Sequence, residues 1–194
     1  MKEKEPEPEP EPEPTTTVLY SPTQEALTQA LNDYEVVNVD FSLENPSAGD
    51  DGSEESNYQF GSMVIPTGKT LNVVGGMMLL EKLETTDTGS DRETDLDIRG
   101  TLNIDSTAML MSMGELSVKV FPGGKLTTSA AANTDSDPGE FMGTEGEVTL
   151  YNCGTLEING NFSCATLTNK AEEDSTIAPS VTVGTEATMS VYTV

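Results

Sequence analysis

Three charged residues close together in the sequence have the types that polysaccharide-cleaving enzymes use. Arg99 lies two residues after Asp97 in Leu96-Asp-Ile-Arg-Gly, and Asp105 follows shortly afterwards. Two carboxyl groups about 5–9.5 Å apart can perform acid–base or nucleophilic chemistry on a glycosidic bond. Aspartates that hold calcium beside Arg99 as the proton-abstracting base would make a lyase instead. Because clustered charges are more often a solvated face, we expect Arg99 mainly to offset the neighbouring acids.

Two acidic stretches place carboxylates at alternating positions beside a glycine, a pattern that can wrap a hard cation. They are Asp50-Asp-Gly-Ser-Glu and Asp135-Ser-Asp-Pro-Gly-Glu140, and the second supplies Asp135, Asp137 and Glu140 as candidate calcium ligands. Neither stretch follows the twelve-residue calcium loop or the glycine-rich nonapeptide repeat. We therefore expect no cofactor, and calcium is the one candidate ion.

Rings that could stack against a sugar are few, because aromatic residues make up 5% of the chain and tryptophan is absent. The candidates are Tyr58, Tyr151 and Tyr192. A tyrosine combines an apolar ring with a polar tip, which suits a sugar but equally suits the edge of a hydrophobic core.

The charge balance excludes several classes of partner. Lys and Arg total 9 against 34 Asp and Glu, for a net charge of −25. Such a surface repels nucleic acid and anionic membranes, and also polyuronates unless a cation intervenes. Histidine is absent, which removes the commonest general base and metal ligand, so catalysis is disfavoured. No apolar run approaches the roughly 20 residues of a transmembrane helix, and no secretory signal is present, as expected of a mature chain.

The two cysteines, Cys153 and Cys164, are too few for a disulfide framework. We expect free thiols. Cys164 follows Phe162 at a spacing of two, which predicts that it points into the core.

The candidate residues lie among short alternating strands, many of which begin at a glycine. In the alternation, apolar residues face a core and polar residues face water. The glycines are expected to turn the corners through positive φ. The segments begin at Gly68, Gly100, Gly114, Gly124, Gly146, Gly154 and Gly184. Leu102, Leu126 and Val148 follow such corners at similar intervals, and a turn of that length holding two or three strands indicates a parallel β-solenoid.

One helix is predicted over residues 22–32, with Ser21 as the N-cap and Pro22 in the first turn. A strand follows from Val36, and the run 75–83 is also expected to be a strand. The clustered methionines are expected to fill the core; they are Met77, Met78, Met109, Met111 and Met113. Residues 1–16 form a separate unit, since Glu-Pro repeats favour an extended polyproline-II stalk over helix or sheet.

The helix Thr23–Leu31, followed by Glu35-Val-Val-Asn-Val-Asp and then Val64-Ile-Pro-Thr-Gly-Lys-Thr-Leu-Asn-Val, resembles the start of right-handed parallel β-helix proteins of the pectate-lyase-like superfamily. There, a helix plugs the open end of the solenoid. The start Lys-Glu-Lys-Glu-Pro resembles the segment after the lipidated cysteine of Bacteroides-type surface lipoproteins. This resemblance implies an extracellular or outer-membrane location with a lipid anchor in the precursor.

These observations predict an all-β chain: a disordered stalk over 1–16 and a single β-helix domain over 17–194, in which 17–45 form the capping helix and first strand. A β-sandwich is the alternative, because alternation alone does not exclude it. We expect a non-catalytic surface domain for adhesion or glycan binding, whose partner is a glycan or another surface protein. The alternatives are a β-helix polysaccharide lyase or glycoside hydrolase, and a structural repeat module. The last strand, 187–194, lacks a capping segment, so we also expect self-association through the C-terminal edge.

Overall fold

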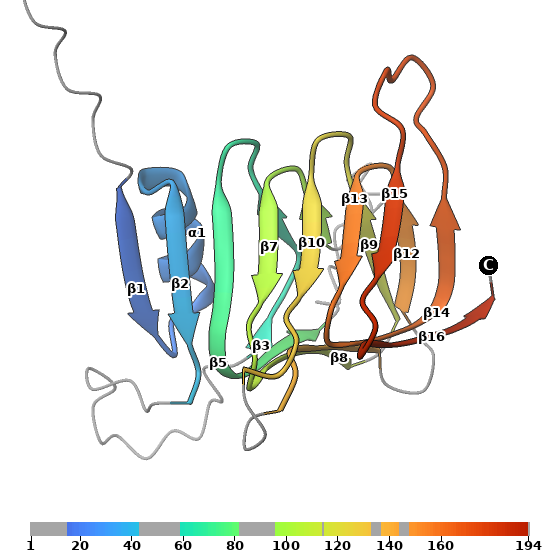
Figure 1. The fold of residues 1–194 in the computed structure, drawn as a ribbon. Coiled ribbons are helices and arrows are strands. Elements are labelled where there is room, and N and C mark those ends of the chain that lie inside the picture. Colours follow the sequence, from blue (N-terminus) through green and yellow to red (C-terminus); the bar gives the residue numbers. More distant parts are fainter. Residues whose placement is uncertain are drawn as a thin grey trace, which may run out of the picture.

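The strands wind into a parallel β-helix in the computed structural model, which describes residues 15–42, 59–81, 96–113, 115–132, 137–143 and 148–193 (Figure 1). Every strand pairing in these residues is parallel. The predicted all-β solenoid is therefore confirmed. The alternative β-sandwich is wrong, because its two sheets would pair antiparallel neighbours.

Three faces repeat along the solenoid axis, and from β2 onward the chain passes from one face to the next. Face 1 contains β1 (Thr16–Tyr20), β2 (Val36–Asp40), the first half of β5 (Thr70–Glu81), β7 (Thr101–Ile104), β10 (Lys125–Thr128), β13 (Thr155–Ile158) and β15 (Ser180–Val183). Face 2 contains β3 (Gln59–Phe60), the second half of β5, β8 (Ala108–Met113), β11 (Glu140–Gly143), the first half of β14 (Asn161–Asn169) and β16 (Thr188–Thr193). Face 3 contains β4 (Met63–Ile65), β6 (Leu96–Ile98), β9 (Leu116–Val120), β12 (Val148–Asn152) and the second half of β14.

The core consists of apolar side chains stacked rung upon rung. On face 1, one stack is formed by Val37, Leu71, Leu102, Leu126, Leu156 and Val181. On face 2, the rings of Phe141 and Phe162 stack with centroids 5.0 Å apart. Val148 does not belong to the series of Leu102 and Leu126, because it pairs with Leu116 on face 3. Its interval along the chain matched by coincidence, since loop length varies from rung to rung.

Helix α1 (Gln24–Asp33) closes the N-terminal end of the solenoid, as predicted, and buries Leu27, Ala30 and Leu31. Its N-cap is Thr23, whose hydroxyl accepts from the Ala26 N–H at 3.2 Å. The expected cap at Ser21 is wrong: Ser21 is buried with φ 41 and donates its N–H to the Asp40 carbonyl. Strand β1, which was not predicted, precedes the helix and pairs with β2.

The described corner glycines occur where predicted, but most serve a different purpose, and Gly114 and Gly146 lie outside the described residues. Among the described residues, glycines with positive φ are Gly68, Gly76 and Gly123, and Gly100, Gly124 and Gly154 are not among them. A Cβ at Gly124 would overlap the Ile98 carbonyl oxygen of the adjacent rung. Glycine is needed at these corners because neighbouring backbones approach closely, not because the chain turns through positive φ.

The prediction that the methionines fill the core is wrong for three of the five residues, and the side chain of Met113 lies outside the described ones. Met78 is buried, but Met77 is 41% exposed and its register partner Met109 also lies on the outer row of the face. Met111 likewise lies outside the core, on the next outer row of the same face. The side-chain period of two sends alternate residues of one strand to opposite sides, so a run of methionines divides between core and surface.

No helix among the described residues is long and apolar enough to cross a membrane. The Glu-Pro stretch predicted as a stalk lies outside the described residues.

Candidate functional site

A row of outward side chains crosses face 3 from rung to rung. Asp97 is in register with Lys119, Lys119 with Tyr151, and Tyr151 with Thr168. Because neighbouring strands lie about 4.8 Å apart, the row spans roughly 14 Å along the solenoid axis. Residues far apart in sequence therefore form one continuous strip.

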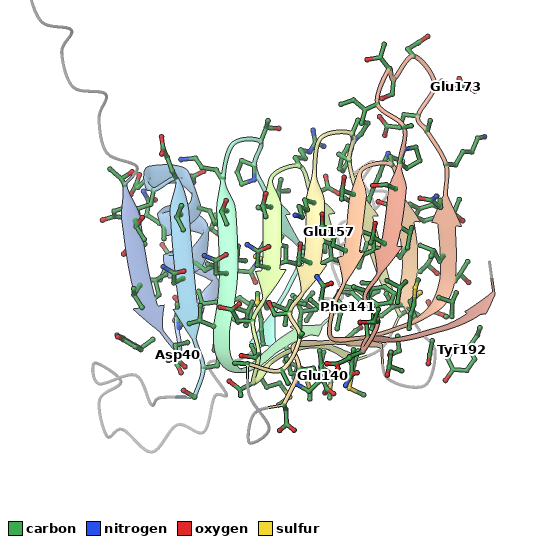
Figure 2. The ribbon with its side chains drawn as sticks, viewed as in Figure 1. Asp40, Glu140, Phe141, Glu157, Glu173 and Tyr192 are labelled. Carbon is green, nitrogen blue, oxygen red and sulfur yellow. The ribbon has the colours of Figure 1, made fainter. Side chains whose placement is uncertain are left out.

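A cavity of about 530 Å³ opens over the later part of this row. We call it the face-3 groove; it is lined by Lys119, Tyr151, Cys153, Thr168, Lys170, Ala171, Glu172 and Glu173. Tyr151 contributes a ring that is 42% exposed. The wall comes from the loop between β14 and β15, which projects beyond the strands near Glu173 (Figure 2).

An ion pair joins the floor of the groove to its wall. The Lys119 Nζ lies 2.6 Å from the Glu172 Oε1, and both side chains are partly shielded from solvent. The same Nζ lies 4.5 Å from the centroid of the Phe121 ring. The Arg99 guanidinium lies 4.1 Å from the same ring centroid. Lys119 is thereby held in place from two sides, which orients it beside Tyr151.

Asn152 anchors both ends of the loop that forms the wall. Its Nδ2 donates to the Asn169 Oδ1 at 2.8 Å and to the Ser180 carbonyl at 2.9 Å. Its carbonyl accepts from the Lys170 N–H, and its Oδ1 accepts from the Gly154 N–H at 3.2 Å. Because this fully buried amide has its donors and acceptor satisfied, it fixes the position of the wall relative to the floor.

The three charged residues proposed for catalysis do not form one site. Asp97 and Arg99 make an ion pair of 3.1 Å beside face 3, where the Arg99 side chain is 48% exposed. Asp105 follows β7 on face 1 and accepts from the Ser129 hydroxyl at 3.2 Å. The spacing in sequence suggested proximity, but the intervening corner sends the two aspartates to different parts of the coil.

The tyrosines predicted for sugar stacking are also separated. Tyr151 lies in the face-3 groove, whereas Tyr192 is 76% exposed on β16 of face 2 (Figure 2). Tyr58 lies outside the described residues.

Of the candidate calcium ligands, Asp135 lies outside the described residues. The Asp137 carbonyl accepts from the Thr107 N–H, and the Glu140 Oε1 accepts from the Asn161 amide at 2.6 Å. In the part of the chain that the structure describes, no three His, Cys, Asp or Glu side chains gather as a metal site would require.

Both cysteines are buried free thiols, as predicted. Burial raises the pKa of Cys164 from 9.0 to about 11. Burial and then the Glu172 carboxylate raise the pKa of Cys153, against an opposing effect of Lys119. A thiol with a raised pKa is a poor nucleophile at neutral pH, so Cys153 lines the groove but does not provide a reactive thiolate there.

Four residues of the site were not predicted from the sequence: Lys119, Thr168, Lys170 and Glu172. No local motif identifies them, because they meet only through the pairing of β9, β12 and β14. One signal could have identified part of the site: Lys119, Tyr151 and Thr168 occupy outward-facing positions of their alternating strands, and they become neighbours once these strands are aligned in register.

Comparisons with protein-family models, with curated proteins and with solved structures find no significant match to this sequence.

Proposed function

We propose that this chain is a non-catalytic carbohydrate-binding domain whose ligand lies in the face-3 groove. The observation that carries the proposal is the half-exposed Tyr151 ring, set in a cavity beside the ordered Lys119–Glu172 pair. Binding sites for small ligands combine apolar surface with a few placed polar groups. A sugar is amphipathic in the same sense: one ring face packs on Tyr151, and its hydroxyls exchange hydrogen bonds with the lysine, glutamate and threonine around it.

Charge favours an uncharged glycan. Lys119 and Lys170 balance Glu172 and Glu173 around the groove, in a chain that carries −25 overall. The long-range field of the molecule repels anionic polymers, whereas the balanced groove attracts neither sign strongly. Neutral hydroxyl-rich chains meet no such barrier.

The arrangement of acids supports binding rather than cleavage. Glu172 is paired with Lys119, and Asp97 and Asp105 belong to different faces. A glycosidase requires two carboxyl groups facing each other across one bond. The lyase and hydrolase alternatives therefore have less support than binding.

A glycan array followed by calorimetry on the best ligand tests this proposal. Tyr151→Ala is expected to weaken binding about tenfold or more, as loss of an aromatic contact centre does. Tyr20→Ala is the matched control, since Tyr20 is 43% exposed on β1, outside the groove, and should leave affinity unchanged. If Tyr151→Ala binds the glycan as tightly as the wild type does, the face-3 groove is not the binding site. Release of new reducing ends from the bound glycan would show that the protein is catalytic.

The chain's place at a cell surface is also proposed, on the resemblance of its start to surface lipoproteins and of its helix-plugged coil to the pectate-lyase-like superfamily. An extended Glu-Pro segment of ten residues would reach roughly 30 Å and hold the domain away from an anchor. Antibody labelling of intact cells, compared with permeabilised cells, tests display. Labelling that requires permeabilisation would contradict it.

A further inference from the structure

The last rung of the solenoid has unpaired strand edges. Strand β15 pairs with β13 and strand β16 with β14, and no described strand pairs with their other edges. Each such edge presents a row of backbone N–H and C=O groups that can accept another strand. In Figure 1 these strands form the end of the solenoid opposite α1.

The apolar interior is also uncovered at this end. Val181, Met189 and Val191 pack against the core but are only partly buried, and Val183 is 46% exposed. One rung further in, Ile158, the register partner of Val183, is fully buried. The end therefore combines open backbone edges with an apolar centre.

The usual protection of a strand edge is missing here. Natural edges carry lysine, other charges, proline or bulges that block pairing. The segments Ser180-Val-Thr-Val and Thr188-Met-Ser-Val-Tyr-Thr contain no charged residue and no proline, in a chain with 34 acidic residues. Glu186 is exposed, but it lies between the two strands, so neither strand carries a charge along its own length. Two copies of so acidic a protein can approach most closely through surfaces of this kind.

We propose that two copies of this chain associate through this end, with the outer edges of β15 pairing across a two-fold axis. The symmetric arrangement is favoured over head-to-tail stacking because α1 covers the interior at the other end and buries Leu27 and Leu31, even though β1 there also has an outer edge that no described strand pairs with. A two-fold contact closes on itself, whereas head-to-tail contacts would continue into a filament. The dimer covers Val181, Val183, Met189 and Val191, and it does not depend on the glycan-binding proposal.

Sedimentation velocity over a wide concentration range, at low and at high salt, tests the dimer. The wild-type chain is expected to shift from monomer to dimer with concentration, and more readily at high salt, because salt screens the repulsion between two acidic bodies. Val183→Lys places a charge on the edge and is expected to remain monomeric throughout. Val18→Lys is the matched control: Val18 is 48% exposed on β1 at the opposite end, so this variant should dimerise like the wild type.

Far-ultraviolet circular dichroism and thermal melts should show that both lysine variants retain the wild-type fold. A wild-type chain that stays monomeric at the highest concentration and salt would overturn the proposal. So would a Val183→Lys variant that dimerises as the wild type does, or a ladder of larger species abolished by Val18→Lys, which would indicate head-to-tail assembly.

Discussion

The two ends of this solenoid are built from the same unit, a short parallel strand with apolar residues facing inward. They differ in whether another element covers that apolar interior. At the N-terminal end, α1 covers the first rungs, and Leu27, Ala30 and Leu31 are at most 5% exposed. At the C-terminal end, the equivalent interior positions reach 46% exposure at Val183. A repeat can extend indefinitely, but each end needs something outside the repeat to cover its core.

The helix is also fastened to the rungs beneath it. The Gln24 side chain donates to the Ser62 carbonyl at 3.0 Å and accepts from the Gly61 N–H at 2.7 Å. Lys69 donates to the carbonyls of Asn32 and Tyr34 at the helix C-terminus. Polar side-chain contacts thus fix the cap at both of its ends, whereas in the described C-terminal rung they are confined to Ser180, at the start of β15. The next four predictions test this difference.

The largest effect is expected at a packed corner. In Gly100→Ala the new Cβ would overlap the carbonyl oxygens of Pro66 and Lys69, so we expect a loss of about 4 kcal/mol or more in unfolding free energy. In Gly184→Ala, next to the C-terminal end, the Cβ meets chiefly the movable Asn159 side chain at 2.9 Å, and the loss should be below about 1 kcal/mol. Urea titrations of both variants measure this, and similar losses would show that the last rung is as tightly packed as the others.

A smaller contrast is expected between the helix and the last rung. Leu31→Ala removes a 2% exposed side chain under the cap and should cost about 3 kcal/mol. Val183→Ala, at 46% exposure, should cost less than about 1 kcal/mol, because little surface was buried there. Thermal denaturation of dilute protein provides the measurement; a larger loss for Val183→Ala would mean that the end is covered in solution.

Cys164 reports on how well the last rung excludes water. It is 1% exposed and in register with Val191, and burial raises its pKa to about 11. In the unfolded chain this thiol has a pKa near 9.0, so the folded state retains a proton that the unfolded state loses. The resulting contribution to the free energy of unfolding is complete below pH 9 and is lost as the pH rises to about 11. The loss should be of the order of 2 kcal/mol.

Unfolding titrations of the wild type and Cys164→Ala between pH 8 and pH 11 should converge as pH rises, because the variant lacks this ionisation. Comparing the two removes the contribution of Cys153, whose pKa is also raised. Parallel profiles, with no convergence, would show that the last rung admits water.

The smallest effect concerns the polar fastening of the cap. Lys69→Met removes two hydrogen bonds to helix carbonyls and should cost about 1 kcal/mol. Lys125→Met breaks an exposed ion pair with Glu157 on face 1 and should cost less than about 0.5 kcal/mol. Chemical denaturation under matched conditions distinguishes the two, and equal costs would mean that Lys69 contributes no more than a surface charge.

Much of the fold was predictable because its signals are local. Alternation in segments such as Thr101-Leu-Asn-Ile predicts a strand buried on one side, and the helix occurs where the sequence predicts it. The prediction failed where the same local pattern allows two outcomes. Met77 and Met78 are both apolar, yet only the register with β8 decides that Met78 faces the core.

The site was less predictable than the fold. Tyr151 was a candidate from its residue type, but Lys119 and Glu172 join it only after β9, β12 and the following loop come together. Asp97 and Asp105 show the converse: they are close in sequence, but the corner between β6 and β7 places them on different parts of the coil. Distances between rungs depend on loop lengths, which alternation does not encode.

Residue types and their spacing were sufficient to predict one helix and short strands buried on one side, and to favour a parallel coil over a β-sandwich, because the burial of alternating apolar side chains acts locally. The role of the helix as a plug was an expectation from the resemblance to other β-helix proteins. Tertiary structure alone decided which residues meet across rungs, which glycines lie against a neighbouring backbone, and which outward side chains gather around one groove. The physical reason is that cross-rung contacts depend on register, and each intervening loop resets the register independently of the strands that it joins.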